Sequence, residues 1–140
     1  MHLKLFNNYP KLLIMDFRGY RELECYKKGR ELRMCVSVLV KKFPAHEKFL
    51  LVAQLVRASR SVTANVAEGY GRFTYLDTRN FFIISRGSVS ETYEHLQTAL
   101  DEGYITNGEY QQGCGLCEDV YKLLNGYIAY LNKQNQIRKS

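Results

Sequence analysis

Apolar residues recur at steps of three and four along most of the chain, which is the period of a helix with one buried face. The first segment with this pattern covers about 20–43 and stops at Pro44, because the residue before a proline is pushed out of helical geometry. Its apolar face consists of Cys25, Gly29, Leu32, Val36, Leu39 and Phe43. The pattern predicts one helix over this segment.

Three more segments continue the same pattern. A second helix is predicted at about 47–70, where the glycines that follow tolerate the conformation in which many helices end. A third is predicted at about 74–102, and it begins at Thr74, which with Asp77 three residues on comes close to a capping box. A fourth begins at Thr106, which forms a capping box with Glu109, and frays at about Lys133. The short apolar runs of the chain all continue a helical pattern, so no strand is predicted.

Four helices with short connections pack antiparallel to their neighbours. The sequence therefore predicts an all-α fold, an antiparallel up-down-up-down four-helix bundle over residues 16–133. Residues 1–15 show no clear helical period before Pro10. They are interpreted as a flexible N-terminal extension, an alternative start or a loosely attached arm. Residues 134–140 are interpreted as a polar tail.

A stripe of polar residues lies beside the apolar face of the second helix, at Gln54, Arg57, Ser61, Asn65, Glu68 and Arg72. If the second and third helices form a hairpin, positions that sum to about 144 face each other. That register brings Arg57 within reach of Ser88 and Glu91, and it places Ser61 by Ile84 and Asn65 by Arg79. We interpret the stripe as a partly buried network in which Arg57 and Glu91 pair, because a buried charge needs a partner.

This network has two possible roles, to set the register between helices or subunits, or to bind a ligand. The structural role is favoured, since no group in it is poised as a nucleophile or a base. Elsewhere, Cys114 and Cys117 form a C-x-x-C inside a helix and on its apolar face, which is typical of buried structural thiols. No histidine has a metal ligand at a useful spacing, so no catalytic residue, metal or cofactor is predicted.

Composition places the chain among globular proteins, with 46% hydrophobic and 24% charged residues. The sequence shows no secretory signal and no apolar run long enough for a membrane span. It therefore predicts a cytoplasmic protein whose four cysteines are reduced.

The net charge of +6 is unevenly placed, with 14 Lys/Arg against 6 Asp/Glu through Arg72 and 6 against 8 beyond it. A basic half attracts nucleic acid, an anionic membrane or an acidic protein, although it can also be a merely solvated surface. The candidates for a nucleic-acid-binding surface are Arg21, Lys27, Lys28, Arg30, Arg33, Lys41, Lys42, Lys48 and Arg60.

The run from Gln54 to Arg72 (QLVRASRSVTANVAEGYGR) resembles the signature of the S23 family, the four-helix-bundle proteins also called 23S rRNA intervening-sequence proteins. The family's relatives include the accessory variability determinant of diversity-generating retroelements. Further matches are Leu23-Glu-Cys-Tyr26, Phe43-Pro44, Arg86-Gly87-Ser88 with Glu91, and Gly103-Tyr104-Ile105. The resemblance covers about Asp16 to Leu131, and Ser85 departs from the family's usual alanine.

This resemblance implies a homopentamer of bundles that binds RNA or DNA without catalysis. In the retroelement relatives the pentamer binds a reverse transcriptase and nucleic acid. The resulting hypothesis is a non-catalytic, oligomeric nucleic-acid-binding accessory protein, with a reverse transcriptase as a partner and no membrane. One alternative is a scaffold that binds an acidic protein without contacting nucleic acid. The other is a bundle with a small-ligand or enzymatic site.

Overall fold

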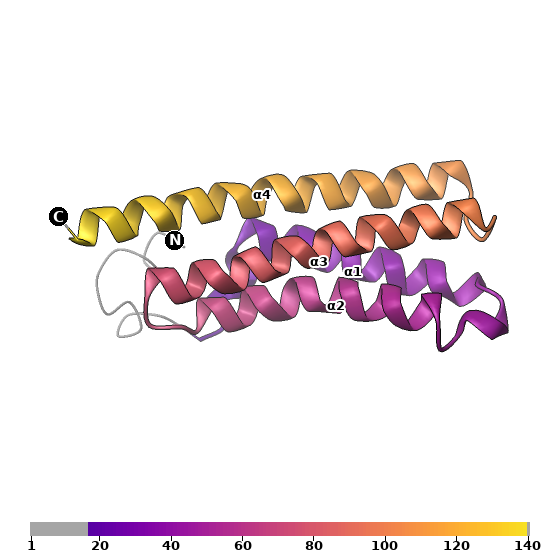
Figure 1. Cartoon of the computed structure of the whole chain (residues 1–140), viewed down its shortest axis with the longest axis horizontal. Helices are drawn as coiled ribbons and strands as arrows, with labels where there is room; N and C mark the ends of the chain where they lie inside the picture. Colours follow the sequence, from indigo (N-terminus) through magenta and orange to yellow (C-terminus); the bar gives the residue numbers. More distant parts are fainter. Residues whose placement is uncertain (1–16, 140) are drawn as a thin grey trace.

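The computed structural model describes residues 17–139, and this part of the chain is all-helical (Figure 1). Four long helices run antiparallel in sequence order, which confirms the predicted four-helix bundle. They are α1 (Glu24–Leu39), α2 (Leu51–Tyr70), α3 (Tyr75–Asp101) and α4 (Asn107–Lys139). No residue between 17 and 139 is in a strand. The predicted N-terminal extension, residues 1–15, lies outside the described residues.

Each helix packs mainly against two neighbours, so α1 and α2 form one side of the bundle and α3 and α4 the opposite side. The core contains the apolar faces that the sequence predicted. Leu32, Leu55, Phe82, Leu96 and Leu124 are all fully buried and come from all four helices.

The first helical segment is not one continuous helix, which corrects the prediction for 20–43. A short 3-10 helix, η3 (Gly19–Glu22), precedes α1, and the chain at Leu23 between them is extended, with φ −70° and ψ 136°. Leu23 is fully buried, so tertiary packing sets this break. A second 3-10 helix, η4 (Val40–Lys42), tightens the end of α1 before the proline.

The second helix begins at Leu51, later than the sequence predicted. Residues 45–47 instead form a 3-10 helix, η5 (Ala45–Glu47). The carboxylate of Glu47 accepts a hydrogen bond from the backbone N–H of Leu51, at 3.2 Å, and so satisfies a donor at the first turn of α2.

Both predicted caps are present. The hydroxyl of Thr74 accepts from the N–H of Asp77 at 3.1 Å and begins α3. At α4 the bonds are reciprocal: Thr106 accepts from the N–H of Glu109 at 3.1 Å, and the Glu109 carboxylate accepts from the N–H of Thr106 at 2.8 Å. Between these helices Gly103 has a φ of +77°, the left-handed conformation that favours glycine.

The fourth helix does not fray at Lys133 but continues to Lys139, so the predicted polar tail is helical as far as that residue. Asn135 is buried one turn beyond Leu131, which is also buried, and this packing extends the helix. Figure 1 shows α4 running the full length of the molecule to the C-terminus.

Two arginine–asparagine pairs fix the register between α3 and α4. The guanidinium of Arg79 donates to Asn132 at 2.9 Å, and that of Arg86 donates to Asn125 at 2.8 Å. The pairs are seven residues apart on both helices, and the residue numbers of each pair add to 211. The same register places Tyr93 opposite Glu118.

A latch joins the α1–α2 and α3–α4 connections at one end of the bundle. The hydroxyl of Tyr104 donates to the carboxylate of Glu47 at 2.7 Å, and its ring packs on Phe43 with centroids 5.3 Å apart. Lys42 forms an ion pair with Glu109 across the same end. We call these five residues the end latch.

Candidate nucleic-acid interface

The predicted polar network exists between α2 and α3, and its centre is the ion pair between Arg57 and Glu91. The side-chain oxygen of Gln54 accepts a further hydrogen bond from Arg57 at 2.9 Å. One turn along, the hydroxyls of Ser61 and Ser88 are 2.8 Å apart. The amide of Asn65 completes this second cluster, donating to the hydroxyl and the carbonyl of Ser61 at 2.9 and 2.8 Å.

The sequence missed one member of the network, His95, whose Nε2 lies 3.2 Å from the Glu91 carboxylate. Partial burial of Glu91 disfavours its charge, but hydrogen bonds from His95 and Arg57 outweigh that effect and lower its pKa. The sequence could have indicated the Glu91–His95 contact, because the two residues are four positions apart on one helix and therefore share a face.

Two details of the predicted network are wrong. Asn65 does not face Arg79, because Arg79 lies on the opposite flank of α3 and donates to Asn132 of α4. Glu68 and Arg72 form an ion pair with each other at 2.9 Å, and the structure gives neither of them a bond to the rest of the network. The guanidinium of Arg72 also stacks on the ring of Phe81, at 4.5 Å from the ring centroid.

The nine basic candidates fall into two groups. Three have carboxylate partners: Lys27 pairs with Glu24 and Lys28 with Glu31, each at 3.5 Å, and Lys42 belongs to the end latch. Within residues 17–139 the other six form no ion pair, namely Arg21, Arg30, Arg33, Lys41, Lys48 and Arg60. The structure therefore leaves an uncompensated positive charge on only part of the predicted surface.

Two of these unpaired cations meet in a groove between α1 and α2. Arg33 and Arg60 line it from opposite helices, with Met34, Ser37 and Ser59 beside them, and its volume is about 150 Å³. Arg30 lies one turn from Arg33 on α1. We call the groove with Arg33 and Arg60 the basic groove, whereas Arg30 borders the neighbouring α1–α4 surface.

Arg33 is held in place within this groove. Its guanidinium donates to the hydroxyl of Thr63 at 2.9 Å, and that hydroxyl donates to the backbone carbonyl of Arg60 at 3.3 Å. The helices approach closely here, since a Cβ on Gly29 would lie 3.2 Å from methyl groups of Val62 and Thr63. A fixed guanidinium with free N–H groups beside a second arginine suits an anionic oxygen group such as a phosphate.

Cys25, Cys114 and Cys117 are buried, as predicted for the last two, and Cys35 is partly buried. Burial raises the pKa of Cys25 and of Cys117 to about 12, which keeps both thiols neutral. Among residues 17–139 no cluster of His, Cys, Asp and Glu side chains is placed to hold a metal ion. No helix in the described chain has the length and hydropathy of a membrane span.

Four antiparallel helices, with a polar network between α2 and α3, define a four-helix-bundle protein. The family model for 23S rRNA-intervening sequence proteins matches residues 21–126, and the chain belongs to this family. A similar solved structure is that of a protein of unknown function from the S23 ribosomal protein family of Bacteroides thetaiotaomicron. It is 25% identical with a TM-score of 0.69, and the match covers 74% of this chain and 97% of that one. Among curated proteins, none matches the chain.

The family assignment confirms the resemblance seen in the sequence. The link to diversity-generating retroelements stays a prediction.

Proposed function

We propose that this protein is a non-catalytic, oligomeric accessory protein that binds RNA or DNA phosphates with the face formed by α1 and α2. The observation that carries the proposal is the basic groove, where Arg33 and Arg60 converge from two helices without a carboxylate partner. Arg30 extends the positive surface along α1, and Lys41 lies exposed just beyond its end.

The groove favours binding over catalysis because of the groups that it presents. A guanidinium keeps its proton in proteins, so it cannot act as a general base. The hydroxyl of Ser59 is already engaged, since it donates to the carbonyl of Val56 at 3.1 Å. Arginine instead offers a planar fork of N–H donors, which matches phosphate oxygens and makes charge-assisted hydrogen bonds.

Oligomerisation would multiply these contacts. A single copy offers a few cations, whereas a homo-oligomer repeats the basic groove around its symmetry axis and engages one nucleic-acid chain at several points. The family resemblance favours a pentamer, and it favours a reverse transcriptase as a protein partner. Binding through phosphates also predicts little preference for base sequence.

The test is an electrophoretic mobility assay of RNA and duplex DNA over a range of salt concentrations. We expect affinity to fall steeply with salt, and the double variant Arg33→Gln/Arg60→Gln to reduce the slope of log K against log salt by about one for each arginine that contacts a phosphate. The matched control is Lys27→Gln/Lys28→Gln, which removes the same charge from α1 where carboxylates already compensate it. Equal slopes for the two double variants would exclude the basic groove.

A second function is favoured by a specific observation, the exposure of apolar residues beside the cations. Met34 and Val38 of α1 are 50% and 66% exposed, and exposed apolar side chains bordered by charge are typical of protein interfaces. An acidic protein would then be the partner. A pull-down that recovers the same protein after nuclease treatment, and loses it on Met34→Ser/Val38→Ser, would support this alternative.

A further inference from the structure

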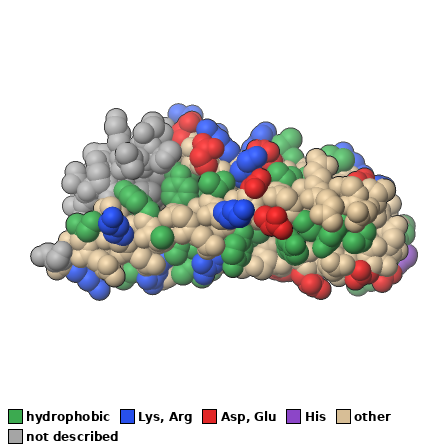
Figure 2. All heavy atoms as spheres, turned by 90° about the horizontal axis from the view of Figure 1, so that it is seen from above, with side chains coloured by type: hydrophobic (Ala, Val, Ile, Leu, Met, Phe, Trp, Pro, Cys, Tyr) green, Lys and Arg blue, Asp and Glu red, His purple; other side chains and the backbone are tan. Residues whose placement is uncertain are grey.

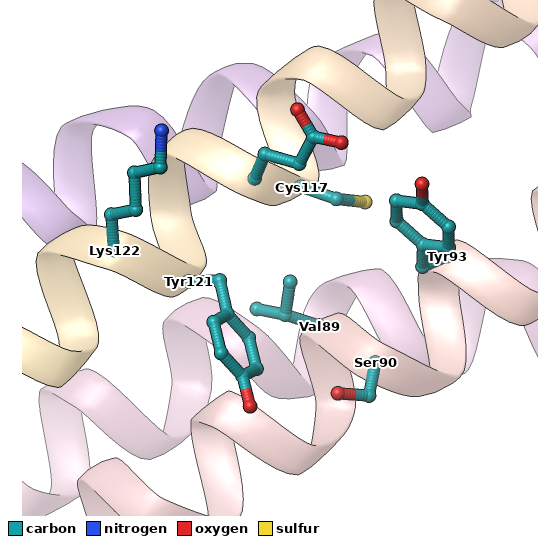
Figure 3. Close-up of a pocket in the computed structure, with 7 residues that line it drawn as sticks. Val89, Ser90, Tyr93, Cys117, Tyr121 and Lys122 are labelled. Atoms are coloured by element: carbon teal, nitrogen blue, oxygen red, sulfur yellow. The ribbon is translucent and has the colours of Figure 1, made fainter.

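A pocket opens between α3 and α4, on the side of the bundle opposite the basic groove. Its volume is about 380 Å³, within the range of small-molecule sites. The lining residues are Val89, Ser90, Tyr93, Cys117, Glu118, Tyr121 and Lys122, which we call the tyrosine pocket. Figure 3 shows Tyr93 and Tyr121 on opposite sides of the opening, with Val89 and Cys117 between them.

The floor of the tyrosine pocket is apolar. Val89 and Cys117 are 2% and 1% exposed, so each shows only its outermost atoms to the opening. The walls are aromatic and still exposed, with 38% of Tyr93 and 39% of Tyr121 accessible. Such a site favours a flat, ring-shaped ligand, because a ring buries apolar area on the floor and contacts the aromatic walls.

One wall is fixed and the other has room to adapt. The hydroxyl of Tyr93 lies within hydrogen-bonding reach of the Cys114 thiol, which also contacts Tyr110. Tyr110 in turn donates to Gln97 at 2.7 Å, so Tyr93 is held from behind by a polar chain. Among residues 17–139, Tyr121 has no such hydrogen-bonded support. A ring can therefore stack on a preset Tyr93 while Tyr121 closes over it.

The rim carries two opposite charges that do not neutralise each other. Glu118 and Lys122 are four residues apart on α4, a spacing that usually permits an ion pair, yet within the described chain neither forms one. The α3–α4 register places Glu118 by Tyr93, and Figure 3 shows Lys122 on the side of Tyr121. A ligand that donates hydrogen bonds at one end and carries negative charge at the other can therefore pair with both Glu118 and Lys122.

A third charged residue, Arg86, decides whether positive or negative charge dominates beside the pocket. Arg86 is one turn before Ser90 on α3, and its partner Asn125 is one turn after Lys122 on α4. Arg86 and Lys122 therefore lie at the same end of the pocket, against the single acid Glu118 at the other. On the face drawn in Figure 2, Lys and Arg side chains lie along the left part of the lower edge, and Asp and Glu side chains lie along the right part. The local excess of positive charge favours an anion over a zwitterion.

We propose that the tyrosine pocket binds a nucleoside monophosphate, either free or at the end of a nucleic-acid strand. The base lies between Tyr93 and Tyr121, its amino group donates to Glu118, and the phosphate lies at Lys122 and Arg86. This assignment does not rest on the function proposed above, because the pocket and the basic groove share no residue.

The test is a titration followed by amide chemical shifts, with adenosine monophosphate and adenosine as probes. We expect the monophosphate to shift amides of residues 86–93 and 117–125, and adenosine to bind more weakly. Tyr121→Ala weakens both ligands by about tenfold, since it removes one stacking face. Lys122→Gln lowers the affinity of the monophosphate towards that of adenosine and leaves adenosine unchanged.

Matched controls keep the result interpretable. Phe73→Ala removes an exposed aromatic ring outside the pocket, and Lys133→Gln removes a cation from α4, the helix that carries Lys122. Both variants should bind as the parent protein does. Arg33→Gln/Arg60→Gln should also bind the monophosphate normally, which separates this site from the basic groove. An oligonucleotide with a 5′-phosphate distinguishes the sources, because a strand end binds at least as tightly as the free nucleotide only if the strand is the natural ligand.

Three results would overturn the proposal. The first is the absence of shifts at roughly 10 mM monophosphate, a concentration that detects even millimolar binding. The second is an affinity that Tyr121→Ala leaves unchanged. The third is a set of shifted amides outside α3 and α4.

Discussion

Gly69, near the end of α2, lies at a close contact between α2 and α3, and its replacement by alanine is our sharpest test of the packing. A Cβ at this position would lie 2.8 Å from the Cβ of Phe81 and 3.1 Å from both a ring carbon of Phe82 and the backbone carbonyl of Thr78. Two of these three atoms are backbone or directly attached to it, so they cannot move aside without shifting a helix.

The expected change in stability combines two opposing effects. Alanine in a helix is favoured over glycine by about 1 kcal/mol. Inserting a carbon into a well-packed contact costs roughly 1–3 kcal/mol. Gly69→Ala should therefore be destabilising, by up to about 2 kcal/mol, despite its better helix propensity.

The control is the same substitution where space is open. Nothing lies within 4 Å of a Cβ added at Gly115 or Gly126, both inside α4. Gly115→Ala and Gly126→Ala should each stabilise the protein by up to about 1 kcal/mol, so the sign reverses between the helices. Urea denaturation at one fixed protein concentration measures all three variants. Stabilisation by Gly69→Ala to the same extent as the controls would refute the close α2–α3 contact.

Two further predictions concern the polar contacts. Because the pKa of Glu91 is lowered in the folded protein, its stabilising effect is present above the ordinary carboxyl pKa and is lost as the pH falls through the lowered value. Glu91→Gln should therefore reduce the loss of stability that the parent protein shows as the pH falls below about 5. Urea midpoints measured from about pH 3 to 7 test this. The same loss of stability in the variant would contradict the Arg57–Glu91–His95 network. Thr106→Ala removes the capping box of α4 and should cost about 1 kcal/mol, whereas Thr106→Ser, which keeps the hydroxyl, should cost much less in the same denaturation assay.

Local signals predicted those parts of the fold that depend on neighbouring residues. The caps at Thr74 and Thr106 are of this kind, because the two partners in each lie three residues apart. The break at Leu23 has no local signal, since burial against other helices extends the chain there. The continuation of α4 to Lys139 was missed for a related reason. A polar residue, Asn135, occupies the buried position one turn after Leu131, so a search for hydrophobic residues at helical spacing stops before it.

The candidate sites also divide into contacts that the sequence predicts and contacts that depend on how the helices pack. The hairpin register predicted the Arg57–Glu91 pair, since α2 and α3 are joined by a short turn. The meeting of Arg33 and Arg60 depends on how α1 and α2 are rotated about their axes, and spacing within one helix does not give that rotation. Tyr93 and Tyr121 each fitted ordinary helix packing, and only the α3–α4 register brings them to one opening.

The end latch has a consequence for how the bundle comes apart. It joins the first pair of helices to the second through contacts whose two partners lie 57 and 67 positions apart in the chain, so at that end the two hairpins cannot separate without breaking it. Its hydrogen bond lowers the pKa of Glu47 and raises that of Tyr104 to about 12. The Tyr104–Glu47 hydrogen bond of the end latch is therefore retained from mildly acidic to alkaline solution, and it keeps the two hairpins joined at the end of the bundle that lacks the α2–α3 turn.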